Sequence, residues 1–280
     1  MNWSYFFSAW GLPGRYPALF DDPKRGEEAR RVFDDAQRLL SEIVDRRLLR
    51  ADGVIGLYPA ASDGDDIVLY ADESRERERM RLPQLRNQQA DRERNLSLAD
   101  FVAPLGSGVK DYVGAFAVTA GLGLEELAGR YRSEGDDYRA IMAKLLADRL
   151  TEAFAEALHR YARVTLWGYE REGQWSVGDL LAEKYQGIRP AFGYPSAPDH
   201  SLKADVFALM DVGTVTGMTM TESYMIVPGE AACGLMLGHP EARNFSVGRI
   251  DSEQLASYAA RRGTDPEKMR VLIPQHLIDM

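Results

Sequence analysis

The residues best suited to bind a small ligand lie in a proline-rich stretch, residues 185–200, which reads Tyr-Gln-Gly-Ile-Arg-Pro-Ala-Phe-Gly-Tyr-Pro-Ser-Ala-Pro-Asp-His. Its prolines exclude a continuous helix or a central strand, so we expect a stiff loop. Arg189 adds a guanidinium fork, which can bind a carboxylate through two parallel hydrogen bonds. A stiff loop also loses little entropy on binding. The stretch therefore predicts a carboxylate site, with a purely structural connector as the alternative.

Acidic side chains that can complete such a site occur upstream of the loop. A helix is predicted over residues 137–161, and Asp148, Glu152, Glu156 and His159 follow one another along it at spacings of four, four and three. Such spacing places the four side chains on one helix face. A polar face of this kind ordinarily meets solvent. Glu183, just before the loop, is a further candidate carboxylate.

Other kinds of chemistry find little support in the residues. The sequence has four histidines, which are scattered, and no Gly-x-Ser-x-Gly element, so a hydrolytic triad is not indicated. A single cysteine, Cys233, permits no internal disulfide. Glu156 and His159 are the closest approach to a metal-binding pair, and further ligands are missing in sequence. We therefore assign no catalytic residue and no metal ligand.

Composition and charge narrow the class of protein. The chain has 280 residues, of which 45% are hydrophobic and 28% charged, as in ordinary globular proteins. Its net charge of −9 and pI of about 5.1 argue against a nucleic-acid partner. The N-terminus lacks the pattern of a secretory signal, and no apolar run approaches the ~20 residues that cross a bilayer. We expect a cytoplasmic protein without a membrane partner.

Hydrophobic periodicity predicts alternating helices and strands. Apolar residues at three- and four-residue steps predict a helix that begins at Asp22-Pro23 and a helix over 137–161 with Ala157 and Tyr161 on its buried side. Residues 54–58 and 67–70 are predicted to form a hairpin, and residues 111–119 a buried strand. Further expected elements are a capping box at Ser176 and Asp179, a helix over 202–210, an antiparallel meander of strands at 218–224, 232–237 and 245–250, and helix starts at Asp251 and Asp265.

The order of these elements indicates one α+β domain over residues 1–280, built on a large antiparallel sheet flanked by helices. No repeat or long low-complexity linker divides the chain. Gly121-Leu122-Gly123 lacks the third glycine of a dinucleotide-binding turn. Residues 72–81 mix arginines with acidic residues, which is typical of a solvated edge.

The loop also resembles a known family. Its Arg-Pro-Ala-Phe-Gly-Tyr-Pro segment, followed by Pro-Asp-His, resembles an element of the activation domain of cobalamin-dependent methionine synthase. Landmarks elsewhere occur in the same order, namely Trp10-x-Leu12-x-Gly14-x-Tyr16-Pro17, Asp65-Asp66-Ile67, residues 98–104, residues 114–119, residues 147–156 and Thr221-Glu222-Ser223. The likeness runs from Trp3 to about Gly263, and ordered blocks of that extent are more specific than one short motif.

This resemblance implies a curved, single-domain version of the fold and a site for S-adenosylmethionine. That ligand carries a carboxylate, an ammonium and a sulfonium, so its site needs an arginine, carboxylates and accessible backbone groups. The resemblance assigns Arg189 to the carboxylate, with Glu152 and Glu183 facing the ligand. The backbone at Ala191 and Gly193 would supply further hydrogen bonds. Tyr194 would either close one side or pack under the loop.

Three positions depart from the family pattern. Asn2 stands where the family has an aspartate that interacts with the amino group of S-adenosylmethionine, so charge assistance worth about 1 kcal/mol or more is lost. Met236 and Leu237 replace an aromatic pair beside the nucleoside. Softer apolar contact would replace stacking there.

The function implied is the reactivation of oxidised cobalamin. In this family an electron from flavodoxin or a similar reductant and a methyl group from S-adenosylmethionine regenerate methylcobalamin. We expect a stand-alone module that acts on cobalamin carried by a separate methionine synthase subunit. One alternative is a docking or scaffold protein for a cobalamin protein, without use of S-adenosylmethionine. Another is an unrelated small-molecule enzyme.

Overall fold

The computed structural model describes residues 1–89 and 95–278. By internal contacts the chain forms two compact units, one of residues 1–53, 118–158 and 226–232, the other of residues 54–117, 159–225 and 233–280. The α+β class is confirmed: within the described residues one sheet has five strands in the order β3-β2-β1-β4-β7, and a smaller sheet pairs β5 with β6. That residues 1–280 act as a single domain stays a prediction.

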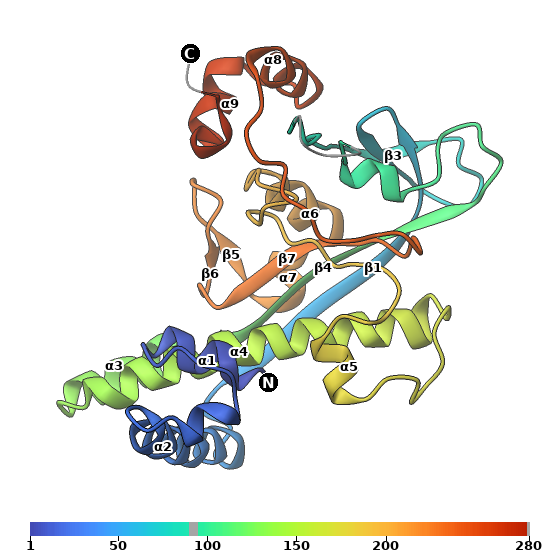
Figure 1. Cartoon of the computed structure of the whole chain (residues 1–280). Coiled ribbons are helices and arrows are strands. Elements are labelled where there is room, and N and C mark those ends of the chain that lie inside the picture. The colour runs from blue at the N-terminus through green and yellow to red at the C-terminus, as the bar shows by residue number, and fades with distance from the viewer. Residues whose placement is uncertain (90–94, 279–280) are drawn as a thin grey trace. The chain divides into compact units, whose positions relative to one another are not determined.

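Helices make up most of the first unit. Its elements are α1 (Trp3–Ala9), η1 (Ala18–Asp21), α2 (Gly26–Asp45), α3 (Leu124–Ser133), nearly all of α4 (Asp137–Tyr161) and β6 (Ile226–Val227). The strands β1 (Arg50–Asp63), β4 (Asp111–Leu122) and β7 (Ala231–Met236) have residues in both units. Figure 1 shows α4 as a long, continuous helix.

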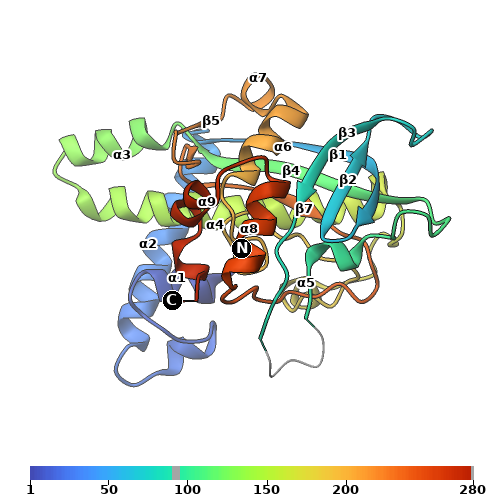
Figure 2. The ribbon, with the colours of Figure 1, turned by 90° about the horizontal axis from the view of Figure 1, so that it is seen from above.

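The second unit combines strands with short helices. Its elements are β2 (Asp66–Tyr70), β3 (Glu78–Pro83), η2 (Leu98–Phe101), η3 (Ala162–Leu166), α5 (Val177–Leu181), α6 (Leu202–Met210), α7 (Val212–Thr216), β5 (Thr219–Met220), α8 (Ser252–Arg261), α9 (Pro266–Leu272) and η4 (Pro274–His276). Figure 2 shows β1, β2 and β3 side by side. In both views α8 and α9 lie next to each other.

The N-terminal core is unusually aromatic. Phe6 and Phe7 are fully buried and contact each other edge to face, with ring centroids 5.7 Å apart. Trp3, Tyr16 and Phe33 pack around them, so α1 is held on α2 by interlocking rings. Edge-to-face and offset contacts of this kind add to the free energy gained by burial alone.

Helix α4 has the predicted bounds, but its buried stripe differs from the prediction. Ala143, Ala147, Thr151, Ala155 and His159 are at most 2% exposed and follow an i, i+4 row, whereas Tyr161 is 48% exposed. The predictions that Ala157 and Tyr161 are buried were wrong. The buried row of α4 includes the polar residues Thr151 and His159, so the apolar pattern of the sequence does not mark it. Thr151 can take part because its Oγ1 lies 2.9 Å from both the Ala120 N and the Glu230 O.

The predicted hairpin forms, but the residues that pair with β2 are 60–63 and not the predicted 54–58. Strand β1 continues to Asp63, and its register with β2 runs from Ala60 opposite Leu69 to Asp63 opposite Asp66. The turn is therefore only two residues long, and its Gly64 has a positive φ of 59°. Residues 54–58 lie in β1 upstream of this pairing.

The strand predicted over 232–237 forms as β7, but the late antiparallel meander predicted around it was wrong. β7 joins the large sheet, β5 has two residues, and residues 245–250 form no strand. Val247 and Ile250 are instead buried in the core beneath α8 and α9. Their backbone N–H groups bond to the Pro195 O at 2.8 Å and the His276 O at 2.7 Å. The apolar pattern there reflects packing on helices, which a strand pattern in sequence does not distinguish.

The helix starts predicted at Asp251 and Asp265 and the capping box at Ser176 are confirmed. The start predicted at Asp22-Pro23 was wrong, because α2 begins at Gly26 and Asp22 instead accepts from Lys24 N and Arg25 N in the preceding turn. Asp251 caps α8 by accepting from Gln254 N, Asp265 caps α9 by accepting from Glu267 N, and Ser176 with Asp179 forms a capping box at α5. Among the described residues, no helix is long and apolar enough to span a membrane. The described part of the chain also contains no group of three or more His, Cys, Asp or Glu arranged to hold a metal ion.

Candidate functional site

The proline-rich loop runs antiparallel along the outer edge of β7. Four backbone hydrogen bonds of 2.9–3.0 Å join them, from Ile188 N to Leu237 O, Leu237 N to Ile188 O, Leu235 N to Pro190 O and Phe192 N to Cys233 O. Pro190 has no N–H, but this position uses only its carbonyl group. The loop therefore covers the last strand of the sheet, and the loop backbone is held by strand-like hydrogen bonds.

Two glycines make this course of the chain possible. A Cβ on Gly234 would lie 2.1 Å from the Pro190 carbonyl oxygen, so only glycine allows the loop to approach β7. Gly193 has a φ of +94° and lies on the ring of His200, where a Cβ would come within 2.4 Å of Cε1. Its N–H donates to the Ala197 O at 2.8 Å, closing the turn. Gly193 is thus required by the turn and by His200.

The far end of the loop is anchored by a buried polar network. Asp199 is 1% exposed and accepts a 2.7 Å hydrogen bond from the Tyr258 hydroxyl of α8. Arg262 Nε lies 3.6 Å from the same carboxylate oxygen. Next to it, the Lys203 ammonium lies 2.7 Å from His200 Nδ1. Burial lowers the pKa of Lys203, and burial together with this ammonium lowers the pKa of His200.

Arg189 belongs to a compact stack of charged and aromatic side chains. Its Nη1 donates to the Tyr185 hydroxyl at 3.2 Å and lies 3.5 Å from His159 Nδ1. The guanidinium carbon of Arg163 lies 3.7 Å from the centre of the Tyr185 ring. Arg163 is completely buried, and its Nε donates to Glu170 Oε2 at 2.8 Å. The Arg189 guanidinium is thus linked through Tyr185 to a desolvated ion pair.

His159 at the end of α4 is kept neutral in this stack. Burial, followed by the positive charges of Arg163 and Arg189, holds the pKa of His159 well below its usual value of 6.5. Neutral imidazole can accept a hydrogen bond at Nδ1, which faces Arg189. Protonation would remove that acceptor and place a third positive charge in the stack.

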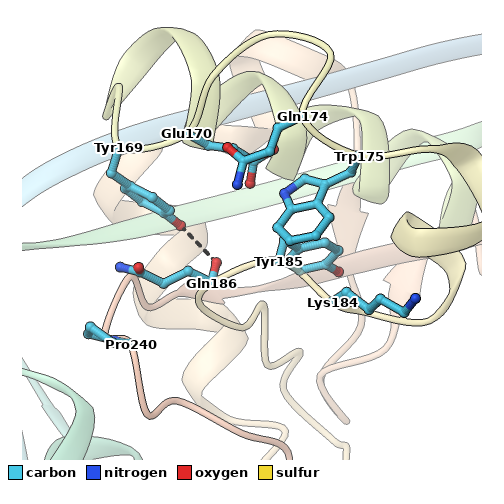
Figure 3. Close-up of a pocket in the computed structure, with 8 residues that line it drawn as sticks. All are labelled: Tyr169, Glu170, Gln174, Trp175, Lys184, Tyr185, Gln186 and Pro240. Carbon is cyan, nitrogen blue, oxygen red and sulfur yellow. Dashed lines mark hydrogen bonds between the residues drawn. The ribbon is translucent and has the colours of Figure 1, made fainter.

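A cavity of about 340 Å³ lies beside Tyr185 (Figure 3). Its walls are Tyr169, Glu170, Gln174, Trp175, Lys184, Tyr185, Gln186 and Pro240. Figure 3 shows the Tyr169 hydroxyl directed at the backbone oxygen of Gln186, 3.3 Å away. Burial raises the pKa of Tyr169. Tyr185 is thus part of both the Arg189 stack and the wall of a cavity.

These features agree with a comparison of the sequence with family models. The model described as vitamin B12 dependent methionine synthase, activation domain, matches residues 1–263. The chain belongs to this family. A solved structure described as the MetH reactivation domain bound to AdoHcy is 42% identical, with a TM-score of 0.97, and the match covers 100% of this chain and 86% of that one. The activation-domain fold and family inferred from the loop are thereby confirmed.

Two of the site residues predicted for this activation domain lie in its first unit. Asn2 caps α1, and its Oδ1 accepts from Ser4 N at 3.1 Å. Glu152 is half-buried on α4. A role for either in ligand binding stays a prediction.

The other predicted residues lie in the second unit, with Arg189. Glu183 is exposed, has a φ of +50° and accepts from Asn244 Nδ2 at 2.9 Å. Ala191 is half-buried, and Tyr194 is 53% exposed. The hydrogen bond from Gly193 N–H to Ala197 leaves its carbonyl as the group that a ligand would use. The ligand contacts of all these residues stay predictions.

Met236 and Leu237 were predicted to contact a nucleoside, and that also stays a prediction. They are 0% and 1% exposed, respectively. Met236 packs against Gly114 of β4, since a Cβ on that glycine would lie 2.9 Å from Met236 Cβ. Contact with a ligand would require these side chains to be uncovered.

Sequence reasoning missed Arg163 and Glu170 and assigned Tyr185 no role. The only local signal is spacing, because Arg163 follows His159 by four residues and Tyr185 precedes Arg189 by four. Arginine and glutamate are rarely fully buried, so nothing in the composition indicates a desolvated pair here.

Proposed function

We propose that residues 1–280 act as a single activation domain that binds S-adenosylmethionine (AdoMet) and supports reductive methylation of cobalamin held by a methionine synthase partner. In that reaction one electron from flavodoxin or a similar reductant and the methyl group of AdoMet convert cob(II)alamin to methylcobalamin and leave S-adenosylhomocysteine (AdoHcy). The chain's own residues bind and orient AdoMet. Such a system operates in the cytoplasm.

The observation that carries this proposal is the Arg189 stack. A guanidinium with fixed orientation, half-buried and backed by a buried ion pair, fits the carboxylate of an amino-acid-bearing nucleoside. The family match and the likeness to a structure bound to AdoHcy support the same ligand class. Glu152, Glu183 and Asn2 are the proposed partners of the ligand ammonium, and the Ala191 and Gly193 backbone and Tyr194 its further contacts.

Calorimetry tests the binding part. AdoHcy and AdoMet should bind the native chain, and Arg189→Ala should weaken both by about 10- to 100-fold, because a charge-assisted hydrogen bond contributes about 1.5–3 kcal/mol. Arg171, an exposed arginine on the preceding loop, provides the matched control, and Arg171→Ala should leave the affinity unchanged. Absence of binding at millimolar ligand contradicts the proposal.

A second assay tests whether the chain supports methylation of cobalamin held by a partner protein. A cobalamin-dependent methionine synthase lacking its own activation region, oxidised to cob(II)alamin, is mixed with this chain, reduced flavodoxin and AdoMet labelled at the methyl group. Label should appear on the corrinoid only when the chain is present. Unchanged cob(II)alamin spectra with all components present would contradict the reactivating role.

One alternative has specific support. Asn2 already uses its side-chain oxygen as a helix cap, and Met236 and Leu237 are buried, so three predicted ligand contacts are occupied by the protein itself. These observations favour a docking protein that binds a cobalamin protein without AdoMet. Association with the cobalamin partner together with no AdoHcy binding would establish it.

A further inference from the structure

We propose that Tyr185 is a positioning residue for Arg189, and that the stack of Arg163, Tyr185 and His159 sets the orientation in which the guanidinium meets a ligand carboxylate. This inference rests on the proposed function, because Arg189 is taken there as the carboxylate-binding residue.

The contacts of Nη1 carry the first step. This nitrogen bears two hydrogens, and two acceptors face it, the Tyr185 hydroxyl at 3.2 Å and His159 Nδ1 at 3.5 Å. Two acceptors on one guanidinium nitrogen define both the position and the plane of the group, since all its N–H bonds are coplanar. A carboxylate therefore meets a guanidinium whose orientation is already set, which reduces the entropy lost on binding.

Tyr185 can do this because its own ring is fixed on two sides. Arg163 lies over one face at 3.7 Å, and the His159 ring meets Tyr185 edge-on, 5.3 Å away at 86°. Arg163 is in turn held by Glu170, and the two side chains are 0% and 5% exposed. A desolvated cation–π contact is among the stronger ones of its kind. The hydroxyl of Tyr185 thus has little freedom to leave Arg189.

The protonation state of His159 completes the arrangement. Accepting at Nδ1 places the proton of the neutral ring on Nε2, a tautomer inferred from the hydrogen-bond geometry. Nε2 is buried and has no hydrogen-bond partner among the described residues. The imidazole is therefore held by packing and by Arg189, and its acceptor atom is reserved for the guanidinium.

A purely structural role and a positioning role make different predictions for two ligands. AdoHcy carries the carboxylate that Arg189 would bind, whereas 5′-methylthioadenosine has the same nucleoside and thioether without the amino-acid group. A residue that acts through Arg189 affects the first ligand alone. A residue that merely supports the fold affects both.

The experiment compares Tyr185→Phe with Tyr169→Phe on the full chain. Phenylalanine keeps the ring and removes the hydroxyl, and Tyr169 lines the same cavity but bonds to Gln186 instead of Arg189. Calorimetry should show AdoHcy affinity about 3- to 10-fold weaker in Tyr185→Phe, from the loss of one hydrogen bond. The affinity of Tyr185→Phe for methylthioadenosine, measured by displacement at millimolar concentration, should stay within about 2-fold of the native affinity. Tyr169→Phe should change the affinity for either ligand by about 2-fold or less.

Variants of His159 give a second, independent readout. His159→Asn keeps an acceptor oxygen near the position of Nδ1, and His159→Leu removes it, so only the second should weaken AdoHcy by a similar factor. Native AdoHcy affinity in Tyr185→Phe overturns the inference, as does an equal loss for both ligands or an equal loss in Tyr169→Phe. Failure of the native chain to bind AdoHcy contradicts the proposed function itself, so the two failures are distinguishable.

Discussion

Gly234 of β7 lies directly against the carbonyl of Pro190, so closely that a Cβ on the glycine would come within 2.1 Å of the carbonyl oxygen. This contact joins the loop that carries Arg189 to the edge of the sheet. The orientation of Arg189 thus depends on the absence of a side chain in a neighbouring strand.

Gly234→Ala should therefore destabilise the chain and displace the loop. Backbone lies on both sides of the contact and cannot yield as a flexible side chain would, so we expect a loss of about 1–3 kcal/mol in the free energy of unfolding. Urea unfolding measures this loss, and AdoHcy affinity should fall with it. Gly129 in α3, with nothing within 4 Å of its Cβ position, is the control, and Gly129→Ala should raise stability by about 0.5–1 kcal/mol. Equal stability of the two variants would contradict the steric argument.

The buried pair of Arg163 and Glu170 should be sensitive to the loss of one partner. Glu170→Gln removes the charged acceptor of the buried Arg163 Nε–H, which should cost about 3–5 kcal/mol. The exposed pair of Arg31 and Glu28 offers a comparison, because Glu28→Gln should change stability by less than about 1 kcal/mol. Chemical denaturation at neutral pH measures the free energy of unfolding of both variants. A loss below about 1 kcal/mol in Glu170→Gln would show that the pair is not desolvated.

We expect His159 to contribute to the loss of folding stability at acidic pH. Its native pKa lies well below the value of 6.5 for an unperturbed histidine, so the unfolded chain takes up this proton first as the pH falls. Stability due to His159 is fully present above about pH 6.5 and declines below it, by up to about 1.4 kcal/mol per pH unit. In His159→Asn the dependence between pH 6.5 and 5 should be shallower. Identical slopes for the two proteins in urea unfolding would be incompatible with a neutral, buried His159.

Asn2 offers a gain-of-affinity experiment. Aspartate caps helices as well as asparagine does, so Asn2→Asp should preserve α1 and the melting temperature. If Asn2 faces the ligand ammonium, the added charge should strengthen AdoMet binding by about 3- to 10-fold, an effect that weakens with salt. Calorimetry at low and high ionic strength measures it. Unchanged affinity with an intact fold would remove Asn2 from the site.

Local signals in the sequence predicted much of the fold. The period of apolar residues gave the bounds of α4, and the capping residues Ser176, Asp251 and Asp265 marked where helices begin. These signals succeed because helix periodicity and capping involve residues within four positions of one another. The Arg-Pro-Ala-Phe-Gly-Tyr-Pro segment likewise indicated the family from sequence alone.

Tertiary structure decided what those signals leave open. The pairing of the loop with β7, the burial of Arg163 and His159, and the packing of residues 245–250 on helices all join segments far apart in the chain. A polar face on a helix looks the same in sequence whether it meets water or a desolvated ion pair, because the difference lies in the segment packed against it. The sequence by itself thus determined that Arg189 stands in a stiff loop. Only the folded chain decided that Tyr185, His159 and Arg163 surround it, since burial and side-chain orientation depend on contacts between distant residues.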